Sequence, residues 1–232
     1  MRREDHELTV IDKPRSIASE AYRTLRTNLG FAGIDQAFRS ILVSSPSPKD
    51  GKSTVTANLG VVMAQAGSRV IIVDCDLRKP VQHHIFKLNN HQGFTNCLMM
   101  EASLDKVIQR AIPELGNLHV LTSGPIPPNP AEMLNSQRVR EFWPMLLQHY
   151  DFVLVDAPPV LAVADASILA SQMDGVIMVT RYGVTRKDQV QQTRETFQKA
   201  NANLIGVVLN QAKIGGDDYN YYYYYSGADS SA

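Results

Sequence analysis

The chain has 232 residues, no formal net charge, and an ordinary balance of 44% hydrophobic and 20% charged residues. This balance is typical of one soluble globular domain and gives no indication of a general nucleic-acid-binding or membrane-binding surface. Cys75 and Cys97 are too few for a disulfide framework, and no apolar run approaches the roughly 20 residues of a membrane-spanning helix. The charged start, Met1 to Asp5, lacks the apolar stretch of a signal peptide, so we expect a cytoplasmic protein without direct membrane insertion.

Short β-branched runs alternate with helical patterns along the chain, which predicts an α/β fold. In chain order we expect helix 16–33, strand 39–44, helix 52–66, strand 69–74, helix 104–111, strand 117–121, helix 131–150, strand 151–156, helix 165–172, strand 175–180, helix 185–200 and strand 203–210. Most of the strands are nearly continuous apolar runs, as expected for parallel strands buried on both faces. The prediction is a mostly parallel sheet flanked by helices on both faces, with one domain over residues 1–211 and a flexible tail over 212–232.

Residues 44–54, Ser-Ser-Pro-Ser-Pro-Lys-Asp-Gly-Lys-Ser-Thr, follow a predicted strand and open a predicted helix. This is the context of a P-loop, whose backbone N–H groups and helix N-terminus bind phosphate oxygens. We expect Lys52 to reach the β- and γ-phosphates of a nucleotide, Ser53 to bind Mg²⁺, and Thr54 to lie near the α-phosphate. The rest of the expected nucleotide-binding loop is Pro48, Lys49, Asp50 and Gly51. The strict P-loop pattern has a glycine where this chain has Pro46.

Carboxylates end two of the apolar strands. Asp74 and Asp76 end one strand, and Asp156 ends another. Ligands of open α/β sheets bind at the carboxyl ends of the strands, so all three should lie at the same edge as the P-loop. A single aspartate at such a position is usually a solvated strand end or a helix cap. Three of them beside a P-loop favour Mg²⁺, with Ser53, Asp76 and Asp156 as its expected ligands.

The chain ends in a tyrosine-rich segment. Six of its nine tyrosines lie within the last fourteen residues, namely Tyr219, Tyr221, Tyr222, Tyr223, Tyr224 and Tyr225. A buried strand would alternate or mix its apolar residues, and a turn would use Gly, Pro or Asn. The segment is therefore either a low-complexity end that is merely adhesive or a dense set of phenolic hydroxyls for modification.

Together these motifs resemble the bacterial tyrosine kinases (BY-kinases), P-loop proteins related to the Min/Par-type ATPases. Residues 44–54 look like the family's Walker A, 70–80 like its Walker A′, 152–159 like its Walker B, and 123–134 like a stretch typical of these proteins. The chain most resembles the cytoplasmic catalytic subunits of capsule and exopolysaccharide synthesis in Gram-positive bacteria. The resemblance implies an ATP- and Mg²⁺-dependent tyrosine kinase that autophosphorylates its tyrosine cluster.

The resemblance also implies partners. Glu20, Arg23 and Arg26 follow the Glu-x-x-Arg-x-x-Arg pattern that the family uses for ring-like self-assembly. On spacing alone, a solvated face of an exposed helix is the preferred interpretation of the three, and the resemblance reverses that order. Gram-positive members need a membrane adaptor, so we expect recruitment to the inner face of the cell membrane. Tyrosines of other proteins are further substrates that the resemblance allows.

For the transfer itself, Lys52 and Mg²⁺ are expected to neutralise the phosphates. A phenol with a pKa near 10 must lose its proton. Asp74 is the expected proton acceptor, although Asp74 and Asp76 could exchange roles. Asn210, at the end of the last predicted strand, resembles the asparagine that recognises adenine in related ATPases, and its alternative role is that of a strand-end turn residue.

Two other functions stay open at this point. One is a Min/Par-type ATPase switch. Those proteins carry a signature lysine five positions before the P-loop lysine, and this chain has Ser47 at that position, which argues against such a switch. The other is a non-catalytic regulatory scaffold that binds nucleotide and offers its tail as a docking segment. Phosphotyrosine formation by the purified chain separates both from a kinase.

Overall fold

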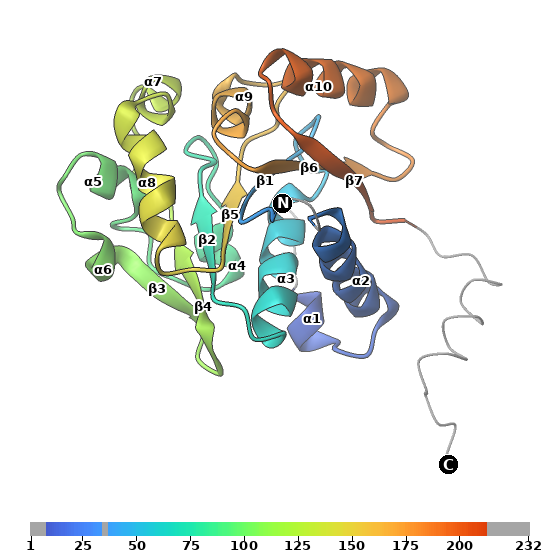
Figure 1. Ribbon diagram of the computed structural model, residues 1–232, viewed down its shortest axis with the longest axis horizontal. Helices are drawn as coiled ribbons and strands as arrows, with labels where there is room; N and C mark the ends of the chain where they lie inside the picture. The colour runs from blue at the N-terminus through green and yellow to red at the C-terminus, as the bar shows by residue number, and fades with distance from the viewer. Residues whose placement is uncertain (1–7, 34–36, 213–232) are drawn as a thin grey trace, which may run out of the picture.

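The computed structural model describes residues 8–33 and 37–212 (Figure 1). The tyrosine-rich tail therefore lies outside the described residues. A single twisted sheet forms the centre of the described part, with helices on both sides of it. No helix in this part is both long enough and apolar enough to span a membrane.

The sheet contains seven strands within the described residues, in the order β3-β4-β2-β5-β1-β6-β7. Their bounds are β1 Ser40–Ser44, β2 Val70–Asp74, β3 Ile108–Ile112, β4 Leu115–Leu121, β5 Phe152–Asp156, β6 Gly175–Arg181 and β7 Leu204–Asn210. Only the β3–β4 pair is antiparallel, and the other pairs are parallel. The predicted mostly parallel sheet is confirmed, and the last strand, β7, runs parallel to its neighbour β6.

The described residues also form ten helices. Their bounds are α1 Thr9–Asp12, α2 Ile17–Ala32, α3 Lys52–Gln65, α4 Gln82–Ile85, α5 Phe94–Leu98, α6 Leu104–Val107, α7 Pro130–Leu134, α8 Gln137–Leu147, α9 Asp165–Ala170 and α10 Lys187–Lys199. The start of α2 is capped by Ser16, whose hydroxyl accepts a hydrogen bond from the backbone N–H of Ser19.

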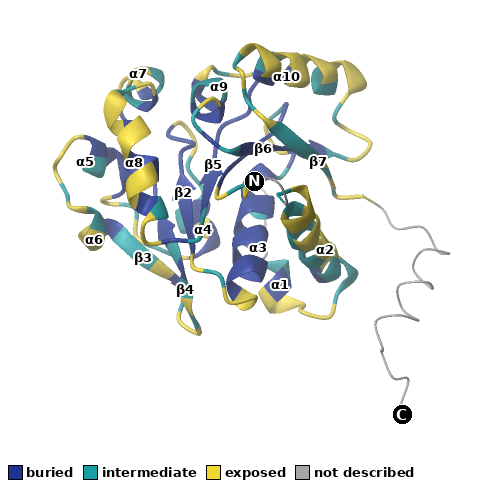
Figure 2. Cartoon of the chain, viewed as in Figure 1, coloured by how far each residue is buried: buried dark blue, intermediate teal, exposed yellow. Residues whose placement is uncertain are grey.

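Two hydrophobic clusters fill the two faces of the sheet. One packs α8, α9 and α10 against the sheet, and the other packs α1, α2 and α3 against the opposite face. Helix α3 contacts both the sheet and α2, so it is buried nearly all round and has no polar stripe (Figure 2). The P-loop helix is thus held on two sides by packing.

Two predicted helices differ from the structure. Residues 104–111 have apolar side chains at helical spacing, yet only α6 is helical and the chain continues directly into β3. Pairing with β4 outweighs the local pattern here. Residues 131–150 form two helices, because the chain turns at Asn135 and Ser136 between α7 and α8.

The carboxyl ends of β1, β2 and β5 meet at one edge of the sheet. In the register of these neighbouring strands, Asp156 lies beside both Asp74 and Val43. The P-loop follows β1 directly, so the loop and the acidic strand ends share this edge. This position is where ligands bind in open α/β sheets.

Candidate nucleotide and phosphoryl-transfer site

The P-loop turns into α3 at Gly51. Gly51 has a φ of +95°, in the left-handed region that glycine adopts without strain. A Cβ atom added at this position would lie 2.0 Å from Nδ2 of Asn210. Both the backbone conformation and the neighbouring side chain therefore require glycine at position 51.

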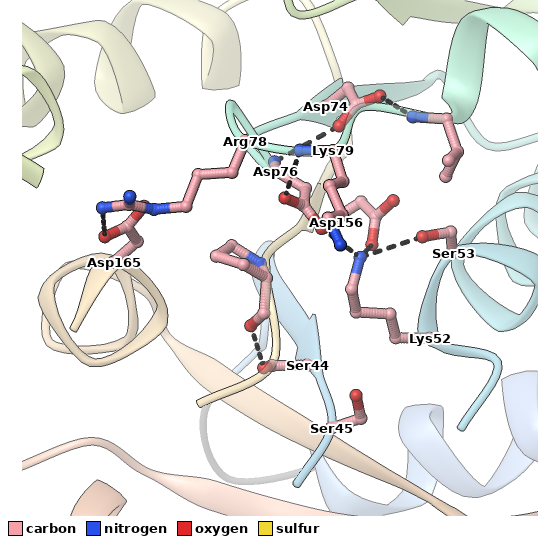
Figure 3. Close-up of polar contacts among 12 residues, drawn as sticks. Ser44, Ser45, Lys52, Ser53, Asp74, Asp76, Arg78, Lys79, Asp156 and Asp165 are labelled. Carbon is pink, nitrogen blue, oxygen red and sulfur yellow. Dashed lines mark hydrogen bonds and ion pairs between the residues drawn. The ribbon is translucent and has the colours of Figure 1, made fainter. Parts of the chain in front are cut away.

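Lys52 lies at the centre of the acidic strand ends (Figure 3). Its Nζ atom is 3.0 Å from Asp76 Oδ2 and 3.1 Å from Asp156 Oδ1, and it donates to Ser53 Oγ at 3.0 Å. Burial lowers the pKa of Lys52, but the Asp156 and Asp76 carboxylates outweigh this effect and leave its pKa raised. The buried ammonium group therefore stays charged and neutralises the two carboxylates.

Asp74 has a different environment from Asp76. Its side chain is fully buried, and its two carboxylate oxygens accept hydrogen bonds from the backbone N–H groups of Asp76, Val81 and Gln82. Burial raises the pKa of Asp74 to about 8, and the nearby Asp156 carboxylate adds to this rise. The geometry gives Asp74 the role of shaping the turn after β2, whereas Asp76 reaches the cavity described below.

Gln82 is a site residue that the sequence did not reveal. Its Nε2 group donates to Asp156 Oδ2 at 2.8 Å and to the backbone oxygen of Ser53 at 3.1 Å. Gln82 thereby connects the P-loop helix to the carboxylate at the end of β5, leaving the other carboxylate oxygen of Asp156 to Lys52. A glutamine after a turn carries no sequence signal of such a role.

Hydrogen bonds of Asp50 and Asn210 hold the P-loop in place. One carboxylate oxygen of Asp50 accepts from the backbone N–H of Ser47, and the other accepts from the Thr185 hydroxyl at 3.0 Å. Asn210 donates from Nδ2 to the backbone oxygen of Asp50 at 2.9 Å, and its Oδ1 accepts from Gln211. Both predicted site residues thus contact the loop rather than the cavity in this structure.

A cavity of about 420 Å³ opens at this edge of the sheet. Its lining residues are Pro48, Lys49, Gly51, Lys52, Ser53, Thr54, Asp76, Arg78, Lys79, Val81, Pro158, Pro159, Ala162 and Val163. The P-loop residues among them are those predicted to bind nucleotide, and the remainder come from the turn after β2 and the segment after β5. The cavity therefore joins a phosphate-binding loop to a second, partly apolar wall.

Arg78 on that second wall is held by Asp165, the first residue of α9. Its Nε donates to Asp165 Oδ2 at 2.9 Å, and its Nη2 donates to Asp165 Oδ1 at 3.1 Å (Figure 3). The Asp165 side chain is fully buried, whereas 41% of the Arg78 side chain is exposed. Hydrogen bonding to Asp165 also raises the pKa of the Arg78 guanidinium.

The donor set fits a nucleotide with a divalent cation. Ser53, Asp76 and Asp156 supply a hydroxyl and two carboxylates around one lysine, which suits Mg²⁺ together with water and phosphate oxygens. Within the described ranges, no group of three or more His, Cys, Asp or Glu side chains is arranged as a metal site by itself.

The residues predicted for self-assembly lie on α2. Arg23 forms an ion pair with Glu20 and also donates to the backbone oxygen of Pro14 at 2.9 Å. Arg26 donates from Nη1 to the backbone oxygen of Val62 in α3 at 3.1 Å. Their role in assembly stays a prediction, and Arg26 has a structural contact as well.

Comparisons with known proteins show which family the chain is similar to. A ParA family model, described as NUBPL iron-transfer P-loop NTPase, matches residues 37–228. Tyrosine-protein kinase YwqD of Bacillus subtilis is 43% identical over 211 residues, covering 90% of this chain and 88% of that protein. Putative tyrosine-protein kinase CapB of Staphylococcus aureus is 38% identical over 222 residues, covering 96% of each. The crystal structure of the chimerical protein CapA2B2 matches with a TM-score of 0.85 and 41% identity, covering 89% of this chain and 90% of that one.

Proposed function

Because the chain belongs to the bacterial tyrosine kinases within the ParA-like P-loop NTPases, we propose that it transfers the γ-phosphoryl group of ATP to its own C-terminal tyrosines. The kinase class and a nucleotide-binding fold follow from the family. The proposal concerns the acceptor tyrosines, the identity of the cation, and whether transfer occurs within one copy or between copies. Its acceptors are the tyrosine at 219 and the five at 221–225.

The single observation that carries the proposal is the hydrogen bond between Asn210 and the P-loop. Asn210 is the last residue of β7, so the chain leaves the sheet at the nucleotide edge. Seven residues separate Gln211 from Tyr219 and could span up to about 25 Å when extended. This reach allows acceptor tyrosines to enter the cavity of the same copy or of a neighbour, and an oligomer favours transfer in trans.

Lys52 and a cation held by the carboxylates together neutralise the negative charge of the phosphates. On nucleotide binding, Lys52 exchanges its two carboxylate partners for the β- and γ-phosphates, and Asp76 and Asp156 become available to a cation. Mg²⁺, when bound, would withdraw charge from the phosphate oxygens and stabilise the leaving diphosphate. Ser53, which already contacts Lys52, supplies the hydroxyl ligand.

The acceptor tyrosine oxygen forms a bond to the γ-phosphorus as the bond from that phosphorus to the β,γ-bridging oxygen breaks. The phenolic proton needs an acceptor at the cavity, and ADP carries the electron pair away. Asp74 stays the proposed acceptor, with Asp76 as the alternative that the sequence also left open. Asp76 lines the cavity but is already assigned to the cation, and a carboxylate bound to Mg²⁺ is a weaker base.

The cellular setting follows from the resemblance. We place the kinase at the inner face of the membrane, recruited by an adaptor and assembled in a ring through Glu20, Arg23 and Arg26, where it regulates polysaccharide synthesis and export. Each phosphotyrosine adds about −1.5 to −2 charges. Several on one tail would repel each other and loosen the ring.

The proposal is tested with the purified full chain, Mg²⁺ and ATP, with and without an adaptor's cytoplasmic segment. Phosphate should appear on the six tail tyrosines by mass spectrometry, and omission of Mg²⁺ should abolish it. Steady ATP hydrolysis with unmodified tyrosines would instead indicate a Min/Par-type switch. Nucleotide binding with neither activity would indicate a regulatory scaffold.

A further inference from the structure

Besides Lys52, three cationic side chains line the cavity, namely Lys49, Arg78 and Lys79, and among them Arg78 forms an ion pair with a buried carboxylate. Lys52 lies among the P-loop and the acidic strand ends, whereas the Arg78 side chain extends away from them toward α9 (Figure 3). The same cavity is also lined by the apolar residues Pro158, Pro159 and Ala162. An apolar wall with one fixed guanidinium suits an aromatic ring that has a negative charge beside it.

The ion pair with Asp165 fixes the direction of the guanidinium. Asp165 is fully buried and binds the Nε and Nη2 side of Arg78 in a bidentate manner. No acceptor for Nη1 occurs among the described residues, and a large part of the Arg78 side chain is exposed. One side of the guanidinium is therefore held by the protein, and Arg78 lines the cavity with Nη1 outside this ion pair.

The tail supplies a matching charge. Asp217 and Asp218 immediately precede the first acceptor, Tyr219. In an extended peptide, residues two apart point to the same side, so Asp217 would face the surface that Tyr219 faces and Asp218 would point away. Of the two aspartates, Asp217 is thus the one that would share a side with Tyr219 in an extended acceptor peptide.

We propose that Arg78, positioned by Asp165, selects acceptor tyrosines that carry a negative charge two residues before them. This deepens the proposed kinase function and rests on it. Arg78 is the specificity-determining residue because it touches the substrate, and Asp165 is a positioning residue that acts through Arg78.

The same rule gives an order of phosphorylation along the tail. Asp217 directs the first transfer to Tyr219, and phosphotyrosine at 219 then lies two residues before Tyr221. Each further transfer places a phosphate two residues before the next acceptor, at 223 and then at 225. Tyr222 has Asn220 two residues before it, so Tyr222 and then Tyr224 are expected to be slower acceptors. A phosphate is a stronger partner for a guanidinium than a carboxylate, so later steps are favoured over the first.

The test uses the full-length kinase and a peptide of residues 213–220, which contains Tyr219 as its one tyrosine. It is compared with two single-change peptides, Asp217→Asn and Asp218→Asn. KM is measured for transfer, and Kd is measured by fluorescence anisotropy in the presence of Mg²⁺ and ADP, so that binding can be followed without activity. We expect Asp217→Asn to weaken both by about fivefold, and Asp218→Asn to change them by less than about twofold.

Enzyme variants assign this preference to Arg78. The ratio of the KM for the Asp217→Asn peptide to the KM for the unchanged peptide should fall to about one in the enzyme variant Arg78→Gln. In Asp165→Asn this ratio should take an intermediate value. Because the ratio is taken within one variant, a general loss of affinity or folding cancels from it. The matched control is Arg69→Gln, which breaks the exposed Arg69–Asp151 pair at the opposite end of β2 and should keep the fivefold ratio.

A second pair of peptides tests the order. An 11-residue peptide with Tyr221 as its acceptor carries either phosphotyrosine or asparagine at position 219, and phosphotyrosine should lower the KM by about tenfold in the unaltered enzyme only. The inference is overturned if the changed and unchanged peptides of either pair have equal KM values in the unaltered enzyme. It is also overturned if Arg78→Gln keeps the difference in KM. Either result means that the Arg78–Asp165 pair is structural. If the kinase also leaves its own tail unmodified, the proposed function itself fails.

Discussion

Asn210, the last residue of β7, donates a hydrogen bond of 2.9 Å to the backbone oxygen of Asp50 in the P-loop. The two residues are 160 positions apart in the chain. This contact joins the strand from which the tyrosine tail departs to the loop expected to bind phosphate. It also fills the space in front of Gly51, where an added Cβ would meet Asn210 at 2.0 Å.

Gly51→Ala should therefore weaken nucleotide binding by more than tenfold. The substitution places a side chain at a φ of +95°, which costs about 1 kcal/mol, and forces Asn210 out of its position. The affinity for a fluorescent ADP analogue and the Tm measure the two effects.

The matched control is Gly67→Ala. Gly67 has a φ of +94°, but an added Cβ would have no atom within 4 Å. This variant should lower the Tm through the same backbone strain and leave nucleotide affinity unchanged. Equal nucleotide affinities in the two variants would show that the contact with Asn210 does not shape the site.

Asn210→Ala distinguishes a role in the loop from recognition of adenine. Both polar atoms of the Asn210 side chain are engaged with backbone groups, so we expect the variant to weaken ADP and GDP binding by a similar factor, about fivefold. Isothermal titration with each nucleotide measures the two constants. A selective loss of ADP affinity would support adenine recognition instead.

Gln82→Met should lower the transfer rate more than it lowers nucleotide affinity. The variant keeps the volume of the side chain but removes the donor to Asp156 Oδ2 and to the Ser53 backbone oxygen. We expect the Mg²⁺ concentration for half-maximal activity to rise by about threefold to tenfold, because Asp156 loses its orientation. An unchanged Mg²⁺ requirement would contradict a positioning role for Gln82.

Substitutions on α2 should separate assembly from stability. Glu20→Ala removes one member of an exposed intrahelical pair, so it should reduce the oligomer mass measured by light scattering with little change in Tm. Arg26→Ala should reduce the mass and also lower the Tm, because it removes the hydrogen bond to Val62 of α3. If Glu20→Ala and Arg26→Ala both leave the mass unchanged, α2 is not the assembly surface.

The fold was largely predictable because buried parallel strands are continuous apolar runs, and because the P-loop marks where one strand ends and a helix begins. The predicted helix 104–111 was wrong beyond Val107, since Leu104, Val107 and Ile108 follow helical spacing while pairing with β4 decides the outcome. The spacing of apolar residues within one segment carries no information on which strand will pair with that segment.

The site was predictable where its residues belong to a local motif and not where they depend on distant contacts. Lys52, Ser53 and Asp76 lie where the motifs place them, at the cavity. The bracing of Asp50 by Thr185 joins residues 135 positions apart, which no local spacing reveals. Arg78 lies in the segment 70–80 that resembles the Walker A′, but its orientation by Asp165 depends on the fold.

The most direct test of the central claim is phosphosite mapping of the full chain after incubation with Mg²⁺ and ATP, beside Lys52→Met and Ser53→Ala. Lys52→Met leaves the buried Asp76 and Asp156 without a counter-ion, which costs about 3 kcal/mol or more, so Ser53→Ala supplies a milder change at the same site. The account predicts phosphate on the tyrosines at 219 and 221–225 in the unaltered chain, its near-complete loss in Lys52→Met, and a loss of at least tenfold in Ser53→Ala. Unmodified tail tyrosines in the unaltered chain with the adaptor segment present, or equal phosphorylation in all three proteins, would contradict it.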